Sequence, residues 1–419
     1  MSIGARVRRG WASHRTAVVW SAVGVMAVAA AIWLGYETFR FFRQPERIGA
    51  IAIHPGAIDL KIFQATVTTW FSGRSVFTGD TAVHAVYPPA SMALMWPIFG
   101  WGGLATSTVV WWLTAVPAVA WLVRTAVRET GASTPAERAF GALLPLATYP
   151  AGAVIGNGQL TLHVLALLVG GLLLLRDRSG RWRDDLLAAA LILLALAKPT
   201  IAAPFFWIVI FAARSLRPAV IVVGAYLALT LFAAGFQEPG IVDLVRRILD
   251  TASALGARAG ESNLHSLLVH LGRPGWITPA SIGILVVLGL WVWRHRDGDY
   301  WLLMGVTAVV ARFWSYHRWY DDLLILLPMI ALHRLAGGGP THRNLDVWAG
   351  VLLASTLVMM LAPGGLYLLP APWNQVWSGV QVAVWLADLA LLLVAAHAER
   401  VARADAAGLA RFELRRSEP

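Results

Sequence analysis

Residues 17–35 read AVVWSAVGVMAVAAAIWLG, an apolar run of the length that crosses a bilayer as a single helix. Comparable runs recur along the chain, and they do not alternate as the strands of a membrane barrel do. The clearest lie at 104–123, 139–155, 159–175, 218–236, 277–294, 346–363 and 377–396, and shorter ones at 88–101, 185–197, 200–213, 299–313 and 323–336. Since only helices or closed barrels span lipid, we predict an all-α polytopic membrane protein with roughly 11–13 transmembrane helices.

The composition agrees with a membrane protein. Only 14% of the 419 residues are charged, against about 25% in soluble domains. The chain has no cysteine, which excludes a thiol nucleophile, a cysteine-ligated metal and disulfide bonds. No basic patch interleaved with aromatic residues accompanies the net charge of +11, so we expect membrane lipids and no nucleic acid as partners.

Arginine positions predict which connections share a side of the membrane. Arginines gather in 6–15, 124–138, 176–183, 214–217, 294–296, 334–343 and the tail 399–419. The positive-inside rule makes these segments, and therefore both termini, cytoplasmic. The opposite side receives the outer loop 36–87, the turns at 156–158 and at Lys198, the second large loop 237–276, and segments 313–322 and 364–376. We expect residues 1–419 to form one polytopic domain of the cell membrane.

Residue 36 is expected outside and residue 124 inside, so the chain must cross the membrane an odd number of times between them. Only two apolar runs are present there. Because Pro88, Pro89 and Pro97 interrupt the run 88–101, we favour a partial helix for it. Apolar residues recur at helical spacing in 241–255, which predicts an amphipathic surface helix. The stretch 59–71 of the first outer loop is a second candidate.

Asp59 lies in this first outer loop, in Gly56-Ala57-Ile58-Asp59-Leu60-Lys61. It is either a solvated loop residue or helix cap, or a general base that takes a proton from an attacking hydroxyl. Lys198 interrupts the apolar stretch 186–204, where an ionisable group is costly and suggests function. Its ammonium could bind a lipid phosphate, or it could extend to the interface.

Segment 312–322 concentrates polar groups between two apolar runs. Arg312 and Arg318 could neutralise a phosphate, and His317 could transfer a proton near neutral pH. The neighbouring rings either stack on a sugar or belong to the interfacial aromatic belt. The adjacent Asp321 and Asp322 diverge on a helix, so we predict no metal site there.

The remaining candidate residues could bind a sugar or an acceptor. Asn157 and Gln159 flank Gly158 between two helices, as a turn and helix cap or as amide ligands of sugar hydroxyls. The other candidates in the outer segments are Tyr87, Asn263, His265 and Tyr316.

The order of these motifs resembles glycosyltransferase family 87 over about residues 15–395. The matching features are Asp59 in the first outer loop, Tyr87-Pro88-Pro89, Asn157-Gly158-Gln159, Lys198-Pro199, and His317 before Leu323–Pro328. The resemblance implies the helical GT-C fold, no metal and no other cofactor. It also implies transfer of a sugar, often mannose, from a polyprenyl monophosphate to a glycolipid or glycan on the outer face, with inversion.

Carried over by position, the resemblance makes Asp59 the base and places His317 with Lys198 or Arg312 at the phosphate. Tyr87, Asn157, Gln159 and Asn263 would line the sugar site. Members of the family include mycobacterial mannosyltransferases that act on phosphatidylinositol mannosides, and related arabinosyltransferases.

Other classes of protein remain open from the sequence. An arabinosyltransferase would use the same kind of donor, and a glycan ligase would use a lipid diphosphate. A transporter or flippase predicts inverted repeats and polar residues near the midplane, whereas here the polar groups gather on one side and no repeat is evident. A non-catalytic scaffold would keep its function without Asp59.

Overall fold

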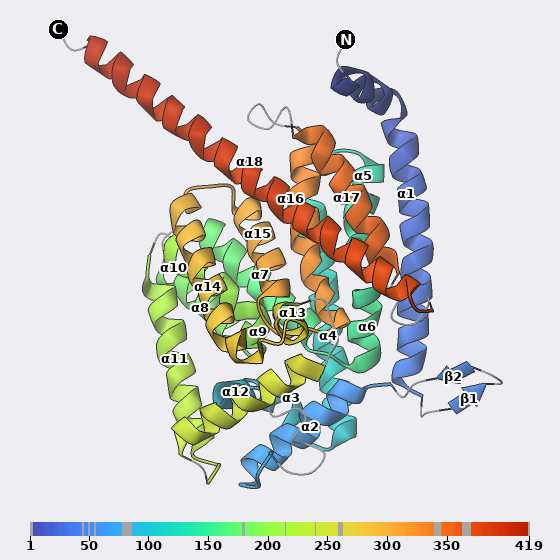
Figure 1. Cartoon of the computed structure of the whole chain (residues 1–419), viewed down its shortest axis with the longest axis vertical. Coiled ribbons are helices and arrows are strands. Elements are labelled where there is room, and N and C mark those ends of the chain that lie inside the picture. Colours follow the sequence, from blue (N-terminus) through green and yellow to red (C-terminus); the bar gives the residue numbers. More distant parts are fainter. Residues whose placement is uncertain are drawn as a thin grey trace.

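The described chain is almost entirely helical (Figure 1), which confirms the all-α class. The computed structural model describes residues 3–43, 46–48, 51–53, 56–77, 86–177, 181–213, 215–238, 240–258, 263–338, 345–362 and 370–417. A short antiparallel hairpin, β1 (Glu46–Ile48) with β2 (Ile51–Ile53), was not predicted from the apolar runs.

Five of the described helices are long and apolar enough to cross a membrane. They are α1 (Ile3–Phe41), α4 (Leu104–Glu129), α11 (Arg217–Ala234), α14 (Ile277–His295) and α18 (Trp373–Ser417). Helix α1 extends into the expected outer loop 36–87, and α18 continues through the expected tail to Ser417. The chain is therefore a membrane-embedded helical protein, but the other runs among the expected 11–13 spans are shorter or broken.

Two of the expected runs are divided by proline. The run 139–155 is split between α5 (Pro135–Leu143) and α6 (Tyr149–Asn157), with Pro145 and Pro150 in or next to the break. The run 200–213 is split into α9 (Pro199–Ala202), η2 (Ala203–Phe205) and α10 (Phe206–Phe211), with Pro204 inside it. Proline lacks the N–H that a continuous helix needs, so the expectation of one spanning run at 139–155 was wrong. The run 200–213 was expected only as a shorter run, and Pro199–Phe211 is a short apolar helical segment.

The shorter helices include α7 (Thr161–Asp177), α8 (Trp182–Ala195), α15 (Tyr300–Phe313), α16 (Leu326–Ala336) and α17 (Asp346–Leu361). Helices α8 and α17 each leave one apolar face exposed. Most side chains of α7, α15 and α16 are buried, as their apolar sequences require. Helix α3 (Pro89–Phe99) spans only about 16 Å at 1.5 Å per residue, far less than a bilayer core of about 30 Å, and agrees with the expected partial helix.

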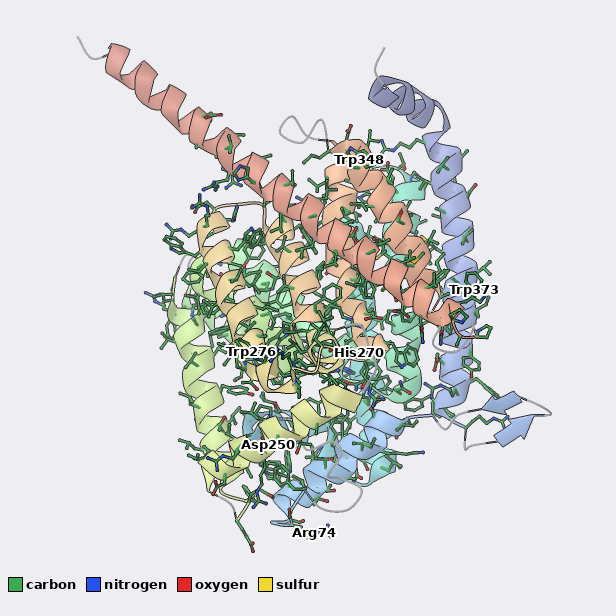
Figure 2. The ribbon with its side chains drawn as sticks, in the orientation of Figure 1. Arg74, Asp250, His270, Trp276, Trp348 and Trp373 are labelled. Carbon is green, nitrogen blue, oxygen red and sulfur yellow. The ribbon has the colours of Figure 1, made fainter. Side chains whose placement is uncertain are left out.

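The two ends of the molecule differ in character (Figure 1). Helix α1 begins and α18 ends at one end, whereas α2 (Ile58–Phe71), α3 and α12 (Ile241–Arg258) lie at the other. Both α2 and α12 are helices that the sequence predicted. Exposed tryptophans mark the sides of the bundle, with Trp348 toward the end that carries the termini and Trp276 nearer α12 (Figure 2), as in an interfacial belt.

The arginine-rich connections meet at the end that carries the termini. Glu129 accepts hydrogen bonds from Arg176 at 2.7 Å and from the Trp301 indole at 2.8 Å. Arg334 donates to the Glu129 carbonyl at 2.9 Å and pairs with Asp299 at 3.2 Å. The segments that the sequence grouped on one side therefore contact one another.

Gly158 controls how closely α2 approaches the turn between α6 and α7, which bend by 116° there. Its φ is +67°, a conformation that glycine adopts without steric cost. A Cβ at Gly158 would lie 2.5 Å from the Leu60 Cβ, next to Asp59 in α2. The amide of Ala57, at the start of α2, donates to the Gly156 carbonyl at 2.8 Å. The glycine therefore lets the helix that carries Asp59 pack onto this turn.

We predict that Gly158→Ala lowers the thermal midpoint of the purified protein more than Gly131→Ala does. Both glycines have positive φ, but a Cβ at Gly131 meets nothing within 4 Å. Each variant should lose about 1–2 kcal/mol to backbone strain, and only Gly158→Ala should also push α2 away. Equal losses in detergent-solubilised protein would show that the close approach of Leu60 does not matter.

Candidate active site

A buried ion pair joins two distant segments of the chain. Lys198 ends the turn after α8 and precedes Pro199, which starts α9. Asp321 lies in η4 (Trp319–Ile325), directly after the polar segment that the sequence singled out. The Lys198 Nζ lies 2.6 Å from the Asp321 Oδ1, and the two residues are only 4% and 3% exposed. Each charge therefore depends on the other for neutralisation.

The hydrogen-bonding capacity of Lys198 is fully used in this site. Its ammonium donates to Asp321, to the Thr161 Oγ1 at 3.0 Å and to the Gln159 Oε1 at 3.4 Å. An ammonium has three N–H donors. Lys198 could bind a substrate phosphate only by giving up one of these bonds, which weakens the expectation that it is a direct phosphate ligand.

Asp321 is equally well supplied with partners. Its Oδ1 accepts from Lys198 and from the Thr161 hydroxyl at 2.6 Å, and its Oδ2 faces the His317 Nδ1 at 3.2 Å and the Arg318 amide at 3.4 Å. Burial opposes ionisation, but Lys198 and His317 hold the pKa of Asp321 well below its usual value. Asp321 is thus a permanently charged anchor and a poor base.

His317 is completely buried beside Asp321. Burial lowers the pKa of His317, although Asp321 partly opposes this. The neutral ring donates through Nδ1 to Asp321, which leaves Nε2 as the unprotonated nitrogen. That Nε2 has no hydrogen-bond partner among the described residues, so it could accept a proton or a hydrogen bond from a substrate.

Asp59 differs from Asp321 in exposure and in partners. It lies in the first turn of α2 and keeps part of its surface accessible. Its carboxylate is hydrogen-bonded by Gln159 and is close to the charges of Lys198, Arg318 and Asp321. Burial raises the pKa of Asp59 to about 6, and Lys198 and Arg318 limit the rise. A carboxylate with this pKa is well matched to general-base catalysis near neutral pH.

Three further predicted residues surround Asp59. Arg318 is exposed, and its side chain donates to the Tyr316 hydroxyl. Burial, together with the charges of Asp321 and Asp59, raises the pKa of Tyr87, so its phenol stays protonated as a donor. Asp59, Tyr87, Tyr316, His317 and Arg318 therefore share one site, although they come from α2, the start of α3 and the segment before η4.

Arg312 belongs to a separate buried cluster. Its Nε bonds Asp322, whose second oxygen accepts from the Tyr149 hydroxyl, and Gln381 donates to that hydroxyl at 3.0 Å. Asp322 neutralises Arg312, which is itself only 3% exposed. This arrangement favours a structural role for Arg312 over the expected role in binding the donor phosphate. The adjacent Asp321 and Asp322 do diverge, as the sequence predicted.

Asn157 also has a structural partner. Its Oδ1 accepts from the Arg40 Nη2 at 2.8 Å, and the Arg40 Nε pairs with the Glu37 Oε2 at 2.6 Å. All three side chains are buried. Helix α1 is thereby bonded to the end of α6, directly beside the turn that supports α2.

Asn263 and His265 lie at the start of α13 (Leu264–His270). Asn263 caps the helix, since its Oδ1 accepts from the Ser266 amide at 3.0 Å. The His265 Nε2 lies 3.1 Å from the Ser281 hydroxyl, which donates to the Trp314 carbonyl at 2.9 Å. Burial lowers the pKa of His265 to about 4, with His317 as a nearby contributor. These bonds hold the 314–318 segment in place.

Sequence reasoning left several members of the site out of the candidate set. Thr161 follows the Asn157-Gly158-Gln159 motif by two residues and could have been found from that position. Asp321 was considered as a possible metal ligand, whereas it is the partner of Lys198. Arg40 and Glu37 lie in an apolar helix, where charged residues indicate a structural or functional role. Tyr149 and Gln381 are uncharged and could not have been found in this way.

Comparisons with known proteins give one family match. The family model described as Glycosyltransferase family 87 matches residues 85–328, more than half of the chain. Searches of the curated proteins and of the solved structures find no match. The matched range contains Lys198, His317 and Arg318, and Asp59 precedes it. The membrane-embedded helical bundle and this match together establish that the chain belongs to glycosyltransferase family 87.

Proposed function

We propose that the protein moves a hexose, mannose, from a polyprenyl monophosphate to a hydroxyl of a glycolipid or glycan, with Asp59 as general base. The observation that carries this proposal is the contrast among three carboxylates. Asp321 and Asp322 are buried and paired with cations, whereas Asp59 is partly exposed and has a raised pKa. Asp59 is the carboxylate that a substrate hydroxyl can reach.

The reaction requires one proton transfer and one bond exchange. The acceptor hydroxyl attacks the anomeric carbon of the donor sugar while Asp59 takes the hydroxyl proton. The bond between that carbon and the phosphate oxygen breaks, and the polyprenyl phosphate leaves with the bonding electrons. A single displacement of this kind inverts the anomeric configuration, and a single base is sufficient.

Charge on the departing phosphate needs a cation that the substrate can approach. Arg318 is exposed and lies close to Asp59, so it fits this role. A planar guanidinium can donate two parallel N–H bonds to phosphate oxygens. It can therefore stabilise the negative charge that develops on the departing phosphate. Lys198 and Arg312 are already paired with Asp321 and Asp322, so they are proposed to support the site without binding the phosphate directly.

The other predicted residues divide between substrate contact and support. The Tyr87 phenol, the Tyr316 phenol and the Gln159 amide lie around Asp59 and are proposed to contact the sugar or the acceptor. His317 is proposed to contact a substrate through its Nε2. Asn157, Asn263 and His265 are proposed to position these groups, because each is bonded within the protein.

The proposed donor also fits the location of the site. A polyprenyl tail partitions into lipid, so its phosphosugar head must lie at the interface. The site lies at the end of the bundle that carries α2 and α12, away from the arginine-rich connections (Figure 1). The positive-inside rule then supports an outward-facing site with both termini in the cytoplasm of a multi-pass membrane protein. An arabinosyl group on the same lipid phosphate is the second candidate, since no described contact selects between the two sugars.

We predict that Asp59→Asn reduces transfer from polyprenyl-phosphate-mannose by about 10²- to 10⁴-fold, because the amide cannot accept the proton. The measurement is incorporation of labelled sugar into a lipid extract of the host. Asp250→Asn is the matched control, since it removes one exposed carboxylate from α12 at the same end of the molecule (Figure 2).

Equal transfer by wild type and Asp59→Asn would move the base elsewhere. If the wild type transfers no mannose but does transfer arabinose from a polyprenyl-phosphate donor, the sugar is arabinose and the proposed class of donor still holds. Inactivity with both lipid monophosphates would contradict the proposed donor.

We predict that kcat/KM rises with pH through a value of about 6 and then levels off. Protonated Asp59 cannot act as a base, so activity is lost as the pH falls below its pKa. Arg318 lowers that pKa, so Arg318→Gln should move the acid limb to higher pH, in addition to any loss of rate. Arg246→Gln, a change of an exposed arginine on α12, should leave the limb unmoved. An acid limb that does not respond to Arg318→Gln would disprove the coupling.

A further inference from the structure

A cavity lined by several charged side chains lies away from the candidate active site. Its volume is about 120 Å³, well above the roughly 10–15 Å³ that one water molecule needs. It lies where the connection between α14 and α15 meets α18, toward the end of the molecule at which both α1 begins and α18 ends (Figure 1). The polar residues that line it are Arg294, His295, Asp297, Asp299, Glu399, Arg400 and Arg403.

Two of the carboxylates in this cavity are already engaged within the protein. Asp299 caps α15 by accepting from the amides of Trp301 and Leu302, and it pairs with Arg334. Glu399 accepts from the Asp299 amide at 3.0 Å and forms an ion pair with Arg403. Arg403 also donates to the Asp297 carbonyl. These contacts fix the α14–α15 connection to α18, and the third carboxylate, that of Asp297, lies 3.9 Å from Arg296.

Three basic side chains in the cavity have no acidic partner among the described residues: Arg294, His295 and Arg400. The Arg400 Nε is buried and has no hydrogen-bond partner there. His295 is 8% exposed, its Nδ1 bonds the Trp291 carbonyl at 2.8 Å, and its Nε2 is also unpartnered. Buried donors without partners cost free energy unless a ligand or water satisfies them.

We propose that this cavity binds a phosphate group, either in the headgroup of an anionic phospholipid or as free phosphate. The two guanidinium groups of Arg294 and Arg400 offer the charged N–H donors that phosphate oxygens accept. The positive-inside rule places this end at the cytoplasmic leaflet, where basic pockets between membrane helices bind anionic headgroups.

A bound headgroup would add a second connection between α18 and the rest of the bundle. Arg400 lies on α18, whereas Arg294 and His295 end α14. A phosphate that accepts bonds from both would hold the two helices together where α18 continues past the bundle. This site is independent of the proposed sugar transfer, because it lies away from α2 and η4.

The test measures the thermal midpoint of the full chain in phosphatidylcholine nanodiscs as phosphatidylglycerol or inorganic phosphate is added. The wild type should be stabilised by phosphatidylglycerol, and the apparent affinity should fall about tenfold or more in the Arg294→Gln/Arg400→Gln double variant. The control is Arg138→Gln/Arg183→Gln, which removes two exposed arginines from the arginine-rich connections outside the cavity.

Stabilisation of the wild type by inorganic phosphate alone, lost in the cavity variant, would identify free phosphate as the ligand. Equal responses in the cavity variant and in the control variant would overturn the proposal. So would a wild type that responds to neither lipid nor phosphate.

Discussion

The ion pair between Lys198 and Asp321 is the interaction on which the site depends. It joins the turn before α9 to η4, and Thr161 and Gln159 of the α6–α7 turn bond to the same ammonium. Gln159 then bonds Asp59, which α2 carries onto the turn across Gly158. Because both charges are buried, neither can be left unpaired without a large cost. The need to keep these two buried charges paired thus holds segments that are distant in sequence at one place.

Pairing with buried cations also distinguishes the structural acidic residues from the proposed base. Asp321 is surrounded by donors and is held in its charged form, and Asp322 is bound by Arg312 and Tyr149. Gln159 hydrogen-bonds Asp59, and the raised pKa of Asp59 reflects burial that nearby cations only partly offset. A paired carboxylate stabilises the structure, whereas a partly desolvated one is available for proton transfer. Differences in environment, rather than in residue type, identify the proposed base.

The sequence predicted the helical class, the surface helices at 59–71 and 241–255, and most polar residues of the site, because hydrophobic runs and buried charges are local signals. It did not predict the breaks in 139–155 and 200–213, where proline divides an apolar run without changing its hydropathy. It also did not predict the protein partners of two candidates, since Asp322 pairs with Arg312 and Arg40 donates to Asn157. Pairing between distant side chains depends on the tertiary fold, which a single sequence does not display.

The most direct test of this central pair is the thermal stability of Lys198→Met, Asp321→Leu and the double variant. Each single change leaves one buried charge without its partner and should cost about 3–5 kcal/mol. The double variant removes both charges together, so its midpoint should lie above that of either single variant. If the two losses simply add, Lys198 and Asp321 act independently, and the site is not organised around their contact.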